Sequence, residues 1–156
     1  MRILIVAVGT RMPQWVAAGF EDYARRLPAQ ERIVLIEVKP EKRALNMSAD
    51  QVLAREARRI DAVLPQGCTR VILDERGRAM SSAQLAEQMV RWRARGKDIA
   101  FIIGGAEGLD AALKSTATTL LSLSPMRLPH ALARVLLVEQ LYRAHAIRCG
   151  HPYHRD

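Results

Sequence analysis

Short apolar runs alternate with stretches of helical periodicity along the whole chain, and this alternation limits the folds that the chain can adopt. Apolar strands interleaved with amphipathic helices are typical of a parallel sheet that is covered by helices. The sequence therefore predicts an α/β fold. The expected strands are residues 2–8, 32–38, 70–74, 99–103 and 118–123.

Helix-start signals follow most of these strands. Ser48 with Gln51 and Ser81 with Gln84 have the spacing of a capping box. Pro13 is expected to open the first helix, and the sequence Glu75-Arg76-Gly77-Arg78 is interpreted as a turn that ends the third strand. The apolar face of the first helix is predicted to comprise Trp15, Val16, Phe20, Tyr23 and Leu27. The later helices are expected at residues 48–64, 81–96, 110–115 and 130–148.

The length of 156 residues favours a single domain, spanning residues 1–156. Apolar runs such as residues 3–8 and 135–138 are far shorter than the roughly 20 residues of a membrane span, so we expect a soluble, cytoplasmic protein without a membrane partner. Cys68 and Cys149 belong to no CxxC motif, which fits a reducing compartment. The formal net charge of +8 favours a polyanionic partner, although a basic balance can also serve solubility alone.

Two loops are expected at the carboxyl edge of the sheet, where open α/β sheets bind their ligands. The first is Gly104–Gly108, whose glycines let a backbone approach a ligand closely, and the second is the proline-rich segment 123–130. Neither a Rossmann fingerprint after the first strand nor a P-loop occurs. Ordinary connecting turns remain the competing interpretation of both loops.

The C-terminal segment concentrates groups that bind or process an anionic substrate. All four histidines lie in the last 27 residues, and arginines accompany them. His151 and His154 lack an evident third ligand, so we predict no metal site. A frayed terminus is the alternative for the tail, and a helix-surface ion pair is the alternative for Glu139 and Arg143. The last helix is more apolar than one covering face requires, so part of it is available to a second subunit.

Several motifs of the chain, taken in order, resemble the pseudouridine methyltransferase H family of the bacterial large ribosomal subunit, which belongs to the SPOUT class of knotted methyltransferases. The resemblance runs from end to end, and the joint spacing is more specific than any single motif. The matching motifs are Val6–Thr10 with Arg11-Met12-Pro13, Tyr23 with Arg26, Leu73–Gly77, Ile102–Gly105 with Glu107-Gly108, Pro129-His130, Arg134, Glu139-Gln140 with Tyr142-Arg143-Ala144, and Pro152–Arg155.

The resemblance implies a SPOUT-type parallel sheet with helices on both faces and a deep C-terminal trefoil knot, which is a rare exception to the rule that chains are not knotted. It implies a methyltransferase that uses S-adenosylmethionine and methylates N3 of a pseudouridine in 23S rRNA on the assembled 70S ribosome. The cofactor-binding positions that it implies are Leu73, Gly104, Gly105, Leu123, Ser124, Pro125, Met126, Arg127 and Leu128.

The resemblance also implies a homodimer in which the tail of one subunit approaches the cofactor of the other. His154 is then the expected base, Tyr153 a stacking surface and Arg155 a substrate-positioning group, while Arg134 and Arg143 are expected at RNA phosphates or at the partner subunit. The chain departs from the family pattern at Arg127, where threonine is common, and at Ala106, where proline is common. A non-catalytic RNA-binding protein and a SPOUT enzyme that acts on tRNA are the alternatives.

Overall fold

The computed structural model describes residues 1–155 and contains a five-stranded parallel sheet with the order β2-β1-β4-β3-β5. Its central strands, β1 and β4, are buried along their whole length. The predicted parallel α/β sheet is therefore confirmed. The strands are β1 (Ile3–Val8), β2 (Ile33–Val38), β3 (Thr69–Ala79), β4 (Ile99–Ile103) and β5 (Thr119–Ser122).

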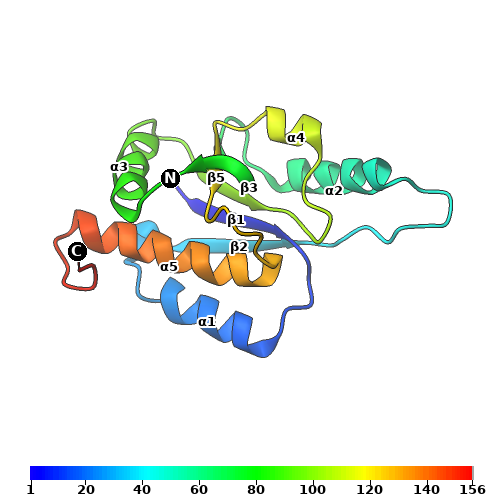
Figure 1. Ribbon diagram of the computed structural model, residues 1–156. Helices are drawn as coiled ribbons and strands as arrows, with labels where there is room; N and C mark the ends of the chain where they lie inside the picture. The colour runs from blue at the N-terminus through cyan, green and yellow to red at the C-terminus, as the bar shows by residue number, and fades with distance from the viewer. Residues whose placement is uncertain (156) are drawn as a thin grey trace.

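Helices cover both faces of this sheet (Figure 1). Helices α1 (Gln14–Ala24), α3 (Ser82–Arg93) and α5 (His130–Arg148) lie on one face, where they pack on Ile3, Ile5 and Ala7 of β1. Helices α2 (Ala49–Val63) and α4 (Ala111–Ser115) lie on the other, where they pack on Leu4, Val6 and Val8. Because successive side chains of a strand point to opposite faces, one buried strand serves both cores.

The local start signals are confirmed. The Ser48 and Ser81 hydroxyls accept hydrogen bonds from the backbone N–H groups of Gln51 and Gln84, and both glutamine side chains bond back to the serine N–H groups. Such caps satisfy backbone donors that the first helical turn leaves unpaired. Helix α5 occupies the range that the sequence predicts.

The predicted end of the third strand at Asp74 is wrong, because β3 continues to Ala79. Leu73 and Arg78 of β3 both pair with Leu121 of β5, so the four residues 74–77 leave the ladder and the strand then resumes its pairing. A Cβ atom on Gly77 would lie 2.7 Å from the backbone carbonyl carbon of Leu120. Glycine is therefore required where this excursion returns to β5, and a turn-like composition marks it in the sequence.

The predicted apolar face of the first helix is correct for Val16 and Phe20, which are buried, and wrong for Trp15, whose exposed fraction is 60%. Successive helical residues are separated by about 100° around the axis, so Trp15 points away from the core face on which Val16 lies. A large apolar side chain is left on the surface of α1.

Candidate functional site

A cavity of about 750 Å³ lies at the carboxyl edge of the sheet, between β3, β4, β5 and the start of α5. Its volume is typical of small-molecule sites, which span roughly 300–1,000 Å³. Of the nine predicted cofactor-binding positions, the wall contains Leu73, Gly104, Gly105, Leu123, Ser124, Met126, Arg127 and Leu128. Pro125 is the predicted position that does not line it.

The glycine loop after β4 forms one wall of the cavity. Gly105 and Gly108 pair in an antiparallel bridge, and the N–H of Gly108 donates to the carbonyl of Gly105 at 3.1 Å. A Cβ atom on Gly104 would lie 2.6 Å from the carbonyl oxygen of Gly108 and 2.8 Å from Cγ of Leu109. Only glycine fits at position 104, and the backbone itself is the surface that a ligand meets there.

The loop between β5 and α5 forms the opposite wall, and its own hydrogen bonds fix it. The buried Ser122 hydroxyl donates to the carbonyl oxygen of Ser124 at 2.9 Å, and the N–H of Met126 donates to the Ser124 hydroxyl at 2.9 Å. Met126 remains 75% exposed at the mouth of the cavity. The loop therefore has internal side-chain hydrogen bonds in addition to two prolines, whose rings restrict its backbone.

An ion pair that the sequence does not predict supports the excursion of β3. Nζ of Lys114 in α4 lies 2.9 Å from a carboxylate oxygen of Asp74, and the N–H of Arg76 donates to the other oxygen at 2.8 Å. Burial acts to raise the pKa of Asp74, but these two hydrogen bonds outweigh it and hold the pKa below its usual value. The carboxylate is thus kept ionised and positioned at the cavity wall.

The tail from Gly150 to Arg155 packs on its own helix rather than on this cavity. The Tyr153 hydroxyl donates to Glu139 at 2.9 Å, and its ring lies 4.7 Å from the Tyr142 ring centroid and 4.7 Å below the Arg143 guanidinium. Nδ1 of His154 is 3.4 Å from a nitrogen of Arg143. Tyr153 and His154 of the tail therefore contact α5, and Arg155 is exposed.

Burial raises the pKa of Tyr153, and the hydrogen bond to Glu139 raises it further. Its phenol stays protonated at neutral pH and donates a hydrogen bond. In this arrangement Tyr153 offers a ring face and a donor, not a base.

Helix geometry separates the tail from the cavity of the same chain. His130 at the start of α5 lines the cavity, whereas Tyr153 contacts Glu139 and Arg143. At 1.5 Å per residue, these two positions lie about 14 Å and about 20 Å along the axis from His130. Figure 1 shows the C-terminus at the end of α5 opposite to the cavity loops. One chain thus does not bring His154, Tyr153 and Arg155 together with its cofactor positions.

The expectation that Arg134 binds RNA phosphate is a poor fit to the structure. Its side chain is 1% exposed, pairs with Glu37 at 2.7 Å and donates to the carbonyl oxygen of Gly9 at 2.8 Å. It holds α5 to the ends of β1 and β2, which is a structural role. Arg143 pairs with Glu139 at 2.6 Å, so the helix-surface ion pair that the spacing suggests is present.

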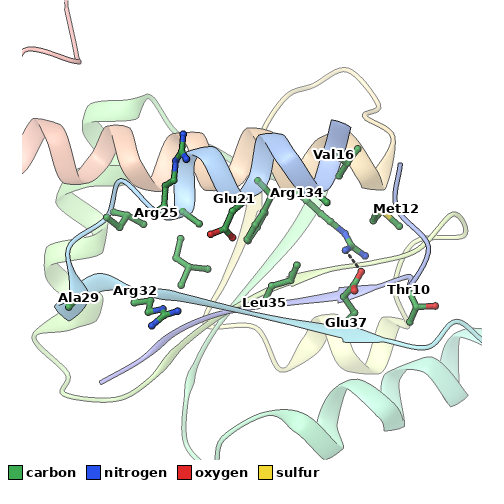
Figure 2. Close-up of a pocket in the computed structure, with 15 residues that line it drawn as sticks. Thr10, Met12, Val16, Glu21, Arg25, Ala29, Arg32, Leu35, Glu37 and Arg134 are labelled. Atoms are coloured by element: carbon green, nitrogen blue, oxygen red, sulfur yellow. Dashed lines mark hydrogen bonds and ion pairs between the residues drawn. The ribbon is translucent and has the colours of Figure 1, made fainter. Parts of the chain in front are cut away.

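A second cavity of about 770 Å³ lies between α1 and the edge strand β2 (Figure 2). Val16, Phe20 and Leu35 contribute to its apolar lining, and Arg25 and Arg32 lie at its rim (Figure 2). The Arg134–Glu37 ion pair closes the end near Thr10 and Met12. This second cavity is not lined by the glycine loop 104–108 or by the segments that follow β3, β4 and β5.

Within residues 1–155, no cluster of three or more histidine, cysteine, aspartate or glutamate side chains is arranged to hold a metal ion. The thiols of Cys68 and Cys149 are both free. In the same part of the chain, none of the helices has the length and apolar character needed to span a bilayer.

The sequence could have indicated Asp74, because it ends the predicted strand 70–74 at the carboxyl edge where ligands bind. Its partner Lys114 could not be predicted, because 40 residues separate the two and only the packing of α4 brings them together. His130 and Pro129 also line the cavity, at the junction of the loop and α5.

Curated bacterial proteins match the chain along nearly its full length. A protein of Bordetella pertussis and one of Ralstonia pickettii, both named ribosomal RNA large subunit methyltransferase H, are 53% and 54% identical to it over 155 residues, which is 99% of this chain and of each relative.

Solved structures of lower identity share the fold. A probable methylase family protein from Haemophilus influenzae aligns with a TM-score of 0.52 at 17% identity, covering 99% of this chain and 70% of that one. TrmJ from Z. mobilis aligns with a TM-score of 0.50 at 16% identity, covering 92% and 70%. Residues 1–154 match the family described as predicted SPOUT methyltransferases. By this match and by its curated relatives, the chain belongs to the SPOUT methyltransferase family.

Proposed function

We propose that this protein is a homodimeric, cytoplasmic enzyme that transfers a methyl group from S-adenosylmethionine to N3 of a pseudouridine in 23S rRNA of the assembled ribosome. The observation that carries the proposal is the cavity at the carboxyl edge, whose wall contains eight of the nine positions expected at the cofactor. The names of the full-length relatives support large-subunit rRNA as the substrate.

The cavity fits an adenosine-type cofactor in volume and in chemistry. Its glycine loop presents backbone, so a flat ring can approach closely, and apolar groups such as Leu73, Leu123 and Leu128 flank it. Carboxylates of Glu75 and Glu107 line the same space and complement the cationic ammonium and sulfonium groups of the ligand, whereas Asp74 is paired with Lys114. Arg127 lies exposed at the mouth, where it faces incoming RNA.

The cofactor supplies an activated methyl group, so the protein's tasks are orientation and removal of one proton. Leu73, the loop at Gly104 and residues 123–128 would hold the cofactor, which would give its methyl group to N3 and leave as S-adenosylhomocysteine, while the N3 proton would pass to a base of this protein. His154 is the base in this proposal, Tyr153 offers a ring face to the target nucleotide, and Arg155 contacts a phosphate. The hydrogen bond from the Tyr153 hydroxyl to Glu139 holds the tail against α5 of its own chain.

A second subunit supplies the tail to the cavity. The tail of the same chain is held about 14–20 Å from its own cavity along α5, so one subunit lacks a complete site. Trp15 of α1 and Leu136 of α5 are exposed apolar residues on two helices that meet where Gly19 approaches Val135. Such a surface favours a partner, and a two-fold dimer is the simplest closed assembly.

The knot expected of the SPOUT class is part of the same proposal. The loop after β5 and the excursion of β3 line one cavity, and β5 pairs with β3 on both sides of that excursion. Segments 74–77 and 119–129 are thus the parts of the chain that such a knot would bring together.

Replacing Lys114 with methionine is expected to weaken binding of S-adenosylmethionine by roughly fivefold, because loss of a partly exposed ion pair releases Asp74 and the 74–77 excursion. Isothermal calorimetry measures the change. The matched control is Arg2→Met, which removes the 2.8 Å ion pair with Asp98 at the opposite edge of the sheet. Equal dissociation constants for the two variants would contradict a role for Lys114 in shaping the cavity.

The proposed activity is tested with ribosomes from a strain that lacks this gene. Labelled methyl groups from S-adenosylmethionine are expected in 23S rRNA of intact 70S ribosomes, at a single pseudouridine located by mass mapping, and not in free rRNA or tRNA. Label in tRNA would reassign the enzyme within the SPOUT class. Cofactor binding without any transfer, or no cofactor binding at all, would favour the non-catalytic RNA-binding alternative.

A further inference from the structure

The connection between β2 and α2, residues 39–48, projects from the body of the molecule as a separate arm (Figure 1). We call residues 39–47 the β2–α2 arm. The arm contains Lys39, Lys42 and Arg43 against one acid, Glu41, and ends in an apolar tip at Leu45. Leu45 is fully exposed.

The base of the arm is held by specific contacts. The Glu41 carboxylate pairs with Arg55 and Arg59 of α2, and the Glu41 N–H donates to Glu56 at 3.1 Å. Arg59 also donates to the carbonyl oxygen of Lys39 at 2.8 Å. The Glu41 side chain is only 13% exposed, so its charge is used internally to fix the arm rather than to neutralise the tip.

Hydrogen bonds within the tip close a turn, and its two cations form no ion pair with the described part of the chain. Nε of Arg43 donates to the carbonyl oxygen of Met47 at 3.2 Å, and the N–H of Met47 donates to that of Ala44 at 3.0 Å, which closes a turn around Leu45. None of the ion pairs within residues 1–155 involves Lys42 or Arg43. The base of the arm is fixed by ion pairs, but the cations Lys42 and Arg43 form no ion pair with the residues that the structure describes, and Leu45 is exposed. These three side chains therefore do not contribute to the hydrophobic core.

The arm rises from the same edge of the sheet as the cofactor cavity. The strands are parallel, so the end of β2 lies at the carboxyl edge, and the N–H of Gly9 at the end of β1 donates to the carbonyl oxygen of Val38 at 2.8 Å. Gly9 in turn packs near Arg134 and His130, and His130 lines the cavity. A nucleic acid that delivers a nucleotide to the cavity therefore passes within reach of the arm.

We propose that the β2–α2 arm binds the ribosomal RNA beside the target nucleotide, with Lys42 and Arg43 on phosphates and Leu45 against a base. This inference rests on the proposed function and deepens it. Cations on a preordered loop bind a polyanion without an ordering cost, and an apolar side chain at a nucleic-acid surface packs on the face or into the step of a base. The arm thus extends RNA contact beyond the cavity in a chain of only 156 residues.

The test compares two doubly substituted proteins that lose the same charge. Lys42→Ala with Arg43→Ala removes the cations of the arm, and Arg95→Ala with Lys97→Ala removes two exposed cations from the turn before β4, at the opposite edge of the sheet. Ribosome affinity is measured by co-sedimentation at several salt concentrations, together with methyl transfer. Circular dichroism verifies folding of both variants.

The arm variant is expected to bind ribosomes roughly tenfold more weakly and to lower the slope of log affinity against log salt by about 1 to 2, whereas the control stays within about twofold of the wild type. Cofactor affinity and kcat stay unchanged in both. Equal losses in the two variants overturn the inference. If only the arm variant loses ribosome affinity, and the wild-type protein transfers no methyl group, the role of the arm is supported and the proposed function is refuted.

A photoreactive side chain at position 45 identifies what the tip contacts. Crosslinks to 23S rRNA are expected. Crosslinks confined to a ribosomal protein would overturn the assignment to RNA, even if the arm variant binds ribosomes weakly.

Discussion

Replacing Gly104 with alanine is expected to weaken binding of S-adenosylmethionine by about 10- to 100-fold while the protein stays folded. The added Cβ would lie 2.6 Å from the carbonyl oxygen of Gly108 and 2.8 Å from Cγ of the buried Leu109. Leu109 is packed in the core, so the exposed part of the glycine loop must move into the cavity. Overpacking of this kind costs about 1–3 kcal/mol, which corresponds to this loss of affinity.

The matched control for this substitution is Gly96→Ala, at the turn before β4. Gly96 has a φ of 65°, and no atom lies within 4 Å of the position that a Cβ would take. Its alanine is expected to lower stability by roughly 1 kcal/mol through backbone strain and to leave cofactor affinity unchanged. Calorimetry and thermal unfolding distinguish the two effects. An unaltered dissociation constant in Gly104→Ala would show that the glycine loop does not contact the cofactor.

The regular elements of the fold follow from local patterns, which explains why they could be predicted. Ser48 and Ser81 mark helix starts because their hydroxyls satisfy backbone donors two or three residues on. The course of β3 could not be predicted in this way. Its pairing with β5 on both sides of residues 74–77 depends on contacts between segments more than 40 residues apart, and Gly77 resembles a turn residue until those contacts are known.

The sequence predicts those parts of the site in which the backbone of a loop lines the cavity. Gly104 and the loop from Leu123 to Leu128 follow strands whose carboxyl ends meet at one edge, so topology alone brings them together. Side-chain partners were not predictable. Arg134 is buried, pairs with Glu37 and donates to the carbonyl oxygen of Gly9 at the end of β1. The sequence of α5 has no pattern that distinguishes it from an exposed arginine.

Removal of residues 150–156 is expected to reduce methyl transfer by at least about 100-fold and to leave cofactor affinity unchanged. Loss of a positioned base alone costs about 10²–10⁴ in rate, and the tail carries the substrate-contacting groups as well. The Tyr153 hydroxyl and ring contact Glu139, Tyr142 and Arg143 of α5, well along the helix from the cavity of the same chain. Transfer rates on ribosomes and calorimetry measure the two quantities, and light scattering verifies that the truncated protein is still a dimer. Full activity in a truncated dimer would refute the role of the tail.

A heterodimer of the truncated chain with a Gly104→Ala chain tests whether that tail acts on the partner. The truncated subunit retains an intact cavity, and the Gly104→Ala subunit retains an intact tail. If the tail serves its own cavity, neither subunit of this heterodimer has both parts, and transfer, assayed at a cofactor concentration that saturates the wild type but not Gly104→Ala, stays as low as in the two homodimers. If it serves the partner, one complete site forms, and the heterodimer, isolated through two different affinity tags, is expected to recover about half of the wild-type rate. Each homodimer is the control for the other defect. Recovery would also establish that a complete site needs two subunits, because each variant subunit alone lacks either the tail or a normal cofactor cavity.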